Sequence, residues 1–208
     1  MLTIHAADAV HGAPDGVDSV AVDGGVVVAV GAYAELTADR PRARIRRWSG
    51  LITPGLLNAA APALLEAAYH PDPREADALG SEPLTGDALA ALAMDDARWG
   101  ASARRGLQRM LRHGTTAVRG PFTRPAVRTA VARSGLRVHA PGPAPEPVSL
   151  DPLASVPKPA DVFAAAPAVG APADLAVFAV RDGAALRTAG AGSCTATVLG
   201  GRLVFRLS

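Results

Sequence analysis

The chain has 208 residues, of which 49% are hydrophobic, 19% charged and only 4% aromatic. This balance excludes a charge-rich disordered chain and predicts a folded protein whose core is filled with Ala, Val and Leu. The 21 basic residues nearly balance the 19 acidic ones, which disfavours a strongly basic nucleic-acid-binding protein.

A cluster of arginines between residues 40 and 47 is the feature most typical of a phosphate-binding surface. However, Arg42, Arg44 and Arg46 alternate along the chain, as residues on the solvent-facing side of a strand do, and no aromatic side chains for base stacking are interleaved. We interpret this cluster as a solvated face and expect no nucleic-acid partner.

Cys194 is the only cysteine, which excludes an internal disulfide and favours a reducing compartment. No basic group lies near it in sequence to lower the pKa of its thiol, so we expect a buried or inert thiol. The first residues lack the features of a signal peptide, and no apolar run approaches the ~20 residues of a membrane span. We therefore expect a cytoplasmic protein with no membrane partner, and the preference for Arg and Ala is typical of a bacterial genome rich in GC.

The first 55 residues predict a small antiparallel sheet. The turn-forming sequence Asp23-Gly24-Gly25 joins two short β-patterned runs into a hairpin, and Pro54-Gly55 ends the region. The expected strands are 2–10, 19–22, 26–30, 44–48 and 51–53.

From residue 56 the hydrophobic period changes to that of helices. One helix is predicted over 87–113 and another over 125–134, each followed by a glycine that favours a helix end. A buried strand is expected at 115–118, and a further strand is expected at 136–138. Helices that alternate with short strands predict parallel βαβ units.

Nine of the chain's 18 prolines lie between Pro141 and Pro172. Proline lacks a backbone donor, so this stretch predicts an extended crossing segment with at most one short helix, around 161–165. After it, 173–180 and 195–207 return to strand patterning, the latter with a Gly-Gly turn.

Four segments together resemble the amidohydrolase superfamily, in particular its imidazolonepropionase and aminodeoxyfutalosine deaminase branch. These segments are VAVDGGVVVAVG, SGLITPGLLNA, ADLAVFAV and TVLGGRLVFR, and LITPGLLNA is the most specific of them. In that family the N- and C-terminal segments join into one composite β-sandwich beside a metal-bearing (β/α)8 barrel. The resemblance implies an α+β fold with a composite β-sandwich from 1–55 and 172–208, a truncated parallel βαβ remnant of a TIM barrel at 56–140, and a Pro/Ala-rich connecting segment at 141–171.

The sequence departs from this family at the metal site. The family continues the last motif with two histidines, at i and i+2, that face the metal, whereas this chain has Ala60 and Pro62, whose side chains offer no lone pair. The segment 141–173 is also too short for the remaining barrel units, which need about 30 residues each. We therefore expect no metal, no cofactor and no metal-dependent hydrolysis.

Three polar residues are candidates for a ligand-binding rim. Asn58, Arg119 and His139 each fall near the C-terminal end of a predicted parallel strand, where α/β folds bind ligands. Such a set suits an anion or a small polar ligand. The alternative is that Arg119 and His139 only satisfy backbone carbonyls exposed by the incomplete barrel.

The other histidines are expected to be structural. His5 and His11 should lie on the surface at the ends of the first strand, and His113 should lie at a helix C-terminus, where a partly cationic ring is favoured. His70 is expected in a solvent-exposed loop, where it could pair with Asp72.

The sequence thus predicts a non-catalytic amidohydrolase-like protein that acts as a binding or partner subunit. The alternative is a hydrolase that acts on the carbon–nitrogen bonds of cyclic amides or aminopurine nucleosides, as the resemblance implies. Only two helices are expected for three parallel strands, so one face or edge should lack cover, and we expect self-association or a protein partner there. If 156–169 folds back as a third helix, the chain should instead be a monomer.

Overall fold

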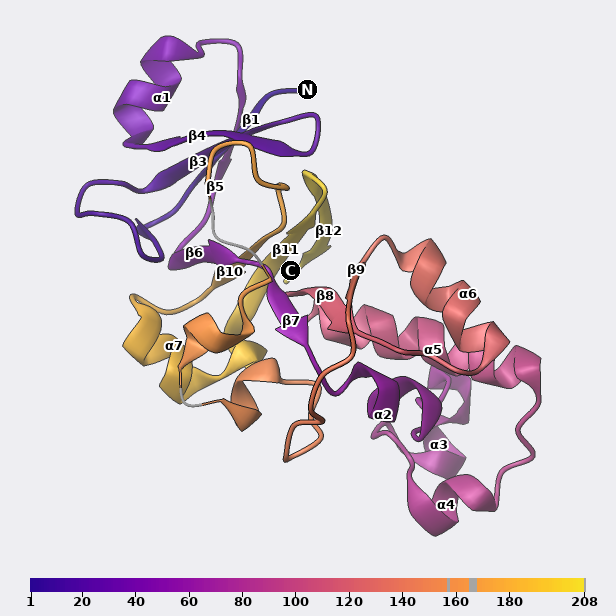
Figure 1. Cartoon of the computed structure of the whole chain (residues 1–208). Helices are drawn as coiled ribbons and strands as arrows, with labels where there is room; N and C mark the ends of the chain where they lie inside the picture. Colours follow the sequence, from indigo (N-terminus) through magenta and orange to yellow (C-terminus); the bar gives the residue numbers. More distant parts are fainter. Residues whose placement is uncertain (157, 165–167, 208) are drawn as a thin grey trace.

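The chain has a mixed α+β fold, which a computed structural model describes for residues 1–156, 158–164 and 168–207 (Figure 1). The strands of this described part form sheets of four, five and three strands. The predicted α+β class is therefore confirmed. No helix in these residues is both long enough and apolar enough to cross a membrane.

The four-stranded sheet has the order β4-β3-β1-β5 and is built only from the N-terminal region. Its strands are β1 (Thr3–Ala6), β3 (Ser19–Asp23), β4 (Val26–Gly31) and β5 (Arg44–Arg47), and helix α1 (Tyr33–Asp39) joins the last two. The prediction of a purely antiparallel sheet is wrong, because β5 pairs parallel to β1. A parallel neighbour needs a crossover connection, and the unpredicted helix α1 supplies part of it.

The five-stranded sheet has the order β12-β11-β10-β6-β2 and joins both ends of the chain. The N-terminal region contributes β2 (Ala9–Val10) and β6 (Leu51–Pro54), and the C-terminal region contributes β10 (Leu175–Phe178), β11 (Cys194–Leu199) and β12 (Arg202–Arg206). The junction is the antiparallel pairing of β10 with β6.

The single opening strand expected over 2–10 is divided between these two sheets. Between the two pieces, the backbone N–H of Asp8 donates to the carbonyl of Gly50 at 2.9 Å, and the Asp8 carboxylate accepts from the Gly50 N–H at 2.6 Å. Gly50 has a φ of +98°, and a Cβ there would lie 2.1 Å from the Phe178 carbonyl oxygen, so only glycine fits. This contact bends the chain from one sheet into the other.

The four- and five-stranded sheets pack face to face over one aliphatic core. The segment before β10 also runs along β4, since the Val27 N–H donates to Ala171 O at 2.9 Å and the Gly170 N–H donates to Val27 O at 2.8 Å. The buried members of the shared core are Val10, Val20, Val22, Val27, Ile52, Ala173, Leu175, Val177, Ala196 and Val198. Because these members come from both ends of the chain, neither end buries this core alone.

The three-stranded sheet is parallel and has the order β7-β8-β9. Its strands are β7 (Leu56–Asn58), β8 (Thr115–Arg119) and β9 (Arg137–His139), connected through α5 (Asp96–Leu111) and α6 (Pro125–Ser134). Helix α6 has the predicted bounds. Figure 1 shows these helices gathered on one side of the three strands.

The single helix predicted over 87–113 is instead two helices, α4 (Gly86–Ala90) and α5. Asp95 is the N-cap of α5, and its side chain accepts a hydrogen bond from the Arg98 N–H at 2.7 Å. A capping carboxylate satisfies a free N–H at a helix start, so it favours a new helix at this point. The hydrophobic spacing continued across the break and therefore did not reveal it.

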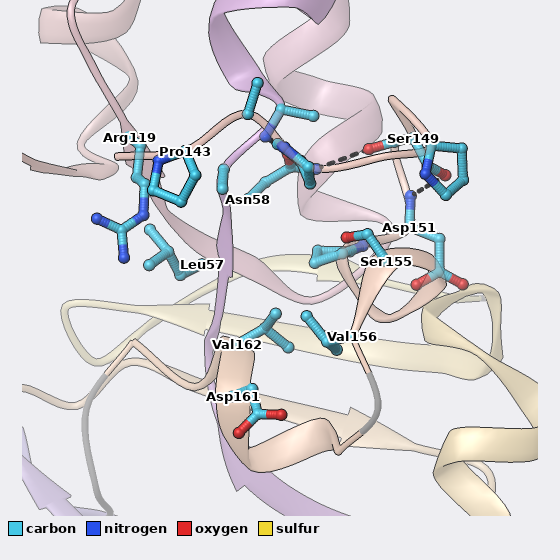
Figure 2. A pocket seen from close by; sticks show the side chains of 16 residues that line it. Leu57, Asn58, Arg119, Pro143, Ser149, Asp151, Ser155, Val156, Asp161 and Val162 are labelled. Atoms are coloured by element: carbon cyan, nitrogen blue, oxygen red, sulfur yellow. Dashed lines mark hydrogen bonds between the residues drawn. The ribbon is translucent and has the colours of Figure 1, made fainter. Parts of the chain in front are cut away.

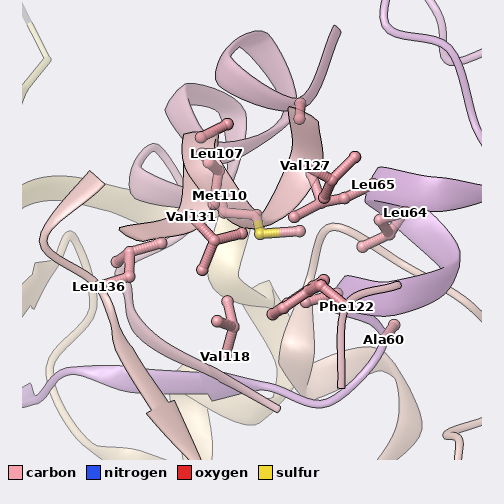
Figure 3. Packing of buried hydrophobic residues seen from close by; sticks show 13 residues of the cluster. Ala60, Leu64, Leu65, Leu107, Met110, Val118, Phe122, Val127, Val131 and Leu136 are labelled. Carbon is pink, nitrogen blue, oxygen red and sulfur yellow. The ribbon is translucent and has the colours of Figure 1, made fainter. Parts of the chain in front are cut away.

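Three helices cover one face of this sheet with a second core (Figure 3). Helix α2 (Ala61–Glu66) follows β7 directly and was not predicted. Met110 of α5 lies near the centre of the cluster in Figure 3, with Leu65 of α2 and Val127 of α6 around it. The remaining short helices on this side are η1 (Pro73–Glu75) and α3 (Ala76–Leu79).

The proline-rich segment is mostly irregular, as its composition predicts. It contains the 3₁₀ helices η2 (Pro152–Ser155) and η3 (Pro159–Val162), and the helix expected around 161–165 reaches residue 165, which lies outside the described residues. Part of the segment covers the outer edge of β7, since the Ala164 N–H donates to Gly55 O at 2.8 Å. Helix α7 (Gly183–Ala189) and η4 (Ala191–Ser193) follow between β10 and β11.

Candidate functional site

A cavity of about 260 Å³ lies at the C-terminal ends of β7 and β8 (Figure 2). The proline-rich segment, including η2 and η3, forms its other walls. The lining residues are Leu57, Asn58, Ala59, Ala60, Arg119, Pro143, Ala144, Pro145, Pro147, Ser149, Asp151, Pro152, Ser155, Val156, Asp161 and Val162. Two of the three predicted rim residues, Asn58 and Arg119, therefore line one cavity.

Asn58 is buried, and its amide group is fully engaged with the main chain. Its Nδ2 donates to Ser149 O at 3.1 Å and to Leu150 O at 3.2 Å, and its Oδ1 accepts from the Ala60 N–H at 2.9 Å. Figure 2 shows the first of these bonds crossing from β7 to the proline-rich segment. Asn58 thus fastens this segment over the strand ends, and its polar atoms are already used.

Arg119 ends β8 and is half-buried at the cavity. Its Nη1 donates to Ala140 O at 3.3 Å, which is the kind of carbonyl contact that the sequence left open as an alternative. A guanidinium group carries five N–H donors, so this single contact leaves donors for a ligand. An added Cβ at Gly142 would lie 2.9 Å from Arg119 Nη1, so the glycine gives the guanidinium group room.

His139 does not line the cavity. It pairs with Arg119 in the register of β9 and β8, so the two residues are neighbours across the sheet. Its side chain is half-buried, and its main-chain carbonyl accepts from the Gly120 N–H at 3.0 Å. The sheet therefore brings His139 beside Arg119 but not into the cavity with Asn58.

The positions of the two missing histidines are apolar in three dimensions. Ala60 is only 4% exposed and belongs to the core cluster that also contains Leu64 and Phe122. Pro62 stands in the first turn of α2, where proline's missing N–H costs nothing. Among the residues that the structure describes, no group of three His, Cys, Asp or Glu side chains could hold a metal ion.

Asp151 is a charged residue of the cavity that sequence reasoning missed. Its Oδ1 accepts from the Leu153 N–H at 2.7 Å, and its Oδ2 accepts from the Ala191 N–H at 2.8 Å. The signal in the sequence was an Asp before Pro152, a pattern typical of a helix start. Its carboxylate is thus occupied in joining the proline-rich segment to the α7–η4 region.

The expectation that His5 lies on the surface is wrong. The residue is 2% exposed, and its Nδ1 accepts from Trp48 Nε1 at 3.2 Å. Burial, and secondly the positive charge of Arg46, lower the pKa of the His5 imidazole from 6.5 to about 4. His5 is therefore a neutral core residue near neutral pH.

The expectation that His70 is exposed and pairs with Asp72 is also wrong. His70 is 0% exposed, and its Nε2 donates to Leu64 O at 2.9 Å, while its Nδ1 is buried with no hydrogen-bond partner among the described residues. Asp72 instead pairs with Arg105 at 3.3 Å. Burial is the largest cause that lowers the pKa of His70, so this ring is also held neutral.

The remaining candidates for chemistry have structural roles. His113 Nδ1 lies 3.0 Å from Arg109 O near the end of α5, as predicted for a helix C-terminus. His11 is half-buried rather than on the surface, because its ring packs edge-on against Phe163 at 4.8 Å. Cys194 is buried, as one of the two predicted possibilities states, and burial raises the pKa of its thiol to about 11, which disfavours the reactive thiolate near neutral pH.

No family model matches the sequence, and no curated protein matches it. The structure is similar to that of ochratoxinase from A. niger, with a TM-score of 0.45 and 19% identity over 67% of this chain and 31% of that chain. It is also similar to an adenosine deaminase from Xanthomonas campestris with bound zinc, with a TM-score of 0.43 and 22% identity over 65% of this chain and 32% of that chain. A third similar structure is molinate hydrolase, with a TM-score of 0.45 and 17% identity over 67% of this chain and 29% of that chain.

Each of these matches covers about two thirds of this chain. The chain spans about a third of the length of these solved structures.

Proposed function

We propose that the chain is a non-catalytic amidohydrolase-like protein, a pseudoenzyme that acts as a binding or partner subunit. In this proposal the two facing sheets are the composite β-sandwich of the superfamily, built from residues 1–55 and 172–208. Residues 56–140 are the remnant of its barrel, and 141–171 connect the two parts.

The observation that carries this proposal is that apolar residues occupy the positions after β7 where the superfamily has metal-binding histidines. Metal-dependent hydrolysis requires about three protein ligands and a water on one ion. Ala60 lies in the core against apolar neighbours, and Pro62 begins a helix, so neither position can hold an ion. Among the described residues no other set of ligands replaces them.

The cavity beside Arg119 supports a binding role. Its volume of about 260 Å³ suits a small molecule, below the about 300–1,000 Å³ of sites for drug-sized ligands. Asn58 and Asp151 hold the walls in place through main-chain contacts, so the site is preformed. Arg119 supplies the donors for an anionic or polar group of such a ligand, with His139 beside it on the next strand.

The edge strand β9 supports a partner role, and we propose a second copy of this chain as the partner. An edge strand presents free backbone donors and acceptors along one side. Val138, in the middle of β9, is 55% exposed although it is an aliphatic residue in a parallel sheet, whose strands are normally covered on both faces. Pairing of two β9 edges would satisfy the free backbone groups and would place Val138 beside an apolar neighbour on the partner strand.

Metal content and turnover, measured on the same purified protein, test the non-catalytic role. We expect no stoichiometric zinc by elemental analysis, and no hydrolysis of cyclic amides or aminopurine nucleosides above background with or without added zinc. The alternative function, a hydrolase of carbon–nitrogen bonds, predicts zinc and turnover together. That result would replace the proposal.

A further inference from the structure

Two arginine-bearing edge strands lie on the same open side of the two packed sheets. Strand β5 is the edge of the four-stranded sheet, and β12 is the edge of the five-stranded sheet. Between them lies a cavity of about 510 Å³ that is lined by Arg46 from β5 and Arg202 from β12. The sequence had indicated only a solvated face at this place.

The strand register decides which arginines face this cleft. Arg46 pairs with His5 of β1, and Arg44 pairs with Thr3, so both belong to the strand face that His5 presents to Trp48. Arg47 belongs to the other face, where its guanidinium group lies 4.2 Å from the Tyr33 ring centroid. Arg44 and Arg46 therefore lie on the face of β5 that borders the cleft, whereas Arg47 lies on the opposite face.

On the opposite strand, Arg206 also lies close to the cleft. Its guanidinium carbon lies 5.8 Å from the Trp48 ring centroid, and its charge acts on Arg46. The Trp48 ring is in turn stacked on His5 at 6.0 Å. This tryptophan is therefore engaged within the protein and is not a free platform for a nucleic-acid base.

Two glycine turns close one end of the cavity. A Cβ at Gly25 would lie 3.0 Å from Gly200 O, and a Cβ at Gly201 would lie 3.0 Å from Gly25 Cα. Both glycines also have positive φ values, of +93° and +76°. The turns can approach this closely only without side chains, and their contact holds the two edges in place.

The charge of the cleft is not balanced by carboxylates. Within the described residues, no carboxylate lies within 4.0 Å of the guanidinium nitrogens of Arg44, Arg46, Arg202 or Arg206. The nearby Asp23 is held by the amino group of Met1 at 3.0 Å. Partial burial, and then repulsion from Arg44 and Arg206, lower the pKa of Arg46, and an anion would relieve this repulsion.

We propose that the cleft between β5 and β12 binds a small molecule that carries a phosphate-like oxyanion, with Arg46 and Arg202 as the groups that contact it. The planar guanidinium fork matches the oxygens of such an anion and can donate two hydrogen bonds to it. Arg44 and Arg206 add positive potential at the rim. This site is separate from the cavity beside Arg119.

Calorimetric titration with inorganic phosphate and pyrophosphate, at an ionic strength held constant with sodium chloride, tests the site. We expect saturable binding of pyrophosphate to the unmodified chain. The double variant R46Q/R202Q should lose at least about tenfold in affinity, since each charge-assisted hydrogen bond contributes about 1.5–3 kcal/mol. The matched control Arg47→Gln removes one charge from the same strand but from its other face, and should change the affinity less than about twofold.

Three results would overturn the proposal. These are no saturable binding to the unmodified chain, an equal loss in the Arg47→Gln control, and binding of a single-stranded oligonucleotide that pyrophosphate does not displace. Thermal unfolding establishes that each variant is folded. If R46Q/R202Q is unfolded, Arg202→Gln and Arg46→Lys replace it, and both must weaken pyrophosphate binding more than the control does.

Discussion

The indole Nε1 of Trp48 donates a hydrogen bond to Nδ1 of His5 at 3.2 Å, and the two rings lie nearly parallel, with an interplanar angle of 7°. This bond requires an unprotonated Nδ1, so it exists only while His5 is neutral. Because His5 is also buried, its protonation must oppose folding.

We therefore predict that the chain loses stability as the pH falls from about 6.5 towards 4. In this window the unfolded chain binds a proton at His5, whose pKa there is near 6.5, while the folded chain, with a pKa of about 4, does not. The loss from His5 alone reaches roughly 3 kcal/mol below pH 4, since one pKa unit is about 1.4 kcal/mol. Urea unfolding at pH 7.5, 5.5 and 4.5 measures it.

The variant His5→Gln is the control for this prediction. It removes the titrating group, so its stability should depend less on pH between 6.5 and 4, with a remainder from the buried His70. An unchanged pH dependence in His5→Gln would show that His5 is not responsible.

The bend at Gly50 predicts a strong effect of a single methyl group. Gly50→Ala would place a Cβ 2.1 Å from Phe178 O and force a side chain into a positive-φ conformation. Gly12→Ala is the matched control, because Gly12 has a φ of +74° but open space around it. We expect the control to cost about 1–2 kcal/mol of unfolding free energy and Gly50→Ala to cost at least about 2 kcal/mol more. Equal losses would contradict the close contact.

The three hydrogen bonds of Asn58 predict that it orders the proline-rich segment. Asn58→Ala should lower the unfolding free energy by about 1–3 kcal/mol, because it leaves buried main-chain groups without partners. Amide hydrogen exchange should become faster at residues 149–153. Asp161→Asn is the control, since Asp161 lines the same cavity but is exposed. Unchanged exchange in Asn58→Ala would show that other contacts hold this segment.

Restoring the two missing histidines should not restore a metal enzyme. In the double variant A60H/P62H the paired imidazoles return, but the described residues contain no preformed group of three His, Cys, Asp or Glu side chains with which they could form a metal site. We expect no zinc-dependent hydrolysis of cyclic amides or aminopurine nucleosides. Turnover that requires zinc in this variant would show that the remainder of a catalytic site is present.

Local signals made some elements predictable. Helix α6 begins at Pro125 and ends before Gly135, whose φ of +78° is a left-handed helix end, and both residues are strong boundary signals in a sequence. Helix α1 was not predicted, because it has no side-chain cap and only seven residues. Without a cap or several turns of hydrophobic period, such a helix depends on tertiary packing.

The burial of histidines could not be read from their neighbours in sequence. His5 is covered by Trp48, which lies 43 positions away in the sequence. His70 lies against α5, where its main-chain N–H donates a hydrogen bond to Ser102 Oγ at 2.9 Å. The candidate site also depends on contacts between residues that are distant in the sequence. The carbonyl groups that accept from Asn58 Nδ2 lie about 90 residues further along the chain. The position of Asn58 at a strand end was therefore predictable, but its hydrogen bonds to the proline-rich segment were not.

The mass of the chain in solution tests the proposed partner role most directly. Size-exclusion chromatography with light scattering over a dilution series should give a dimer at high concentration and a monomer on dilution. Val138→Glu, which places a charge on the exposed residue of β9, should shift the chain to monomer at every concentration, whereas Val169→Glu, at a residue that is 68% exposed and lies outside that strand, should not. A monomeric mass of the unmodified chain at all concentrations, with no co-purifying protein, would contradict the account.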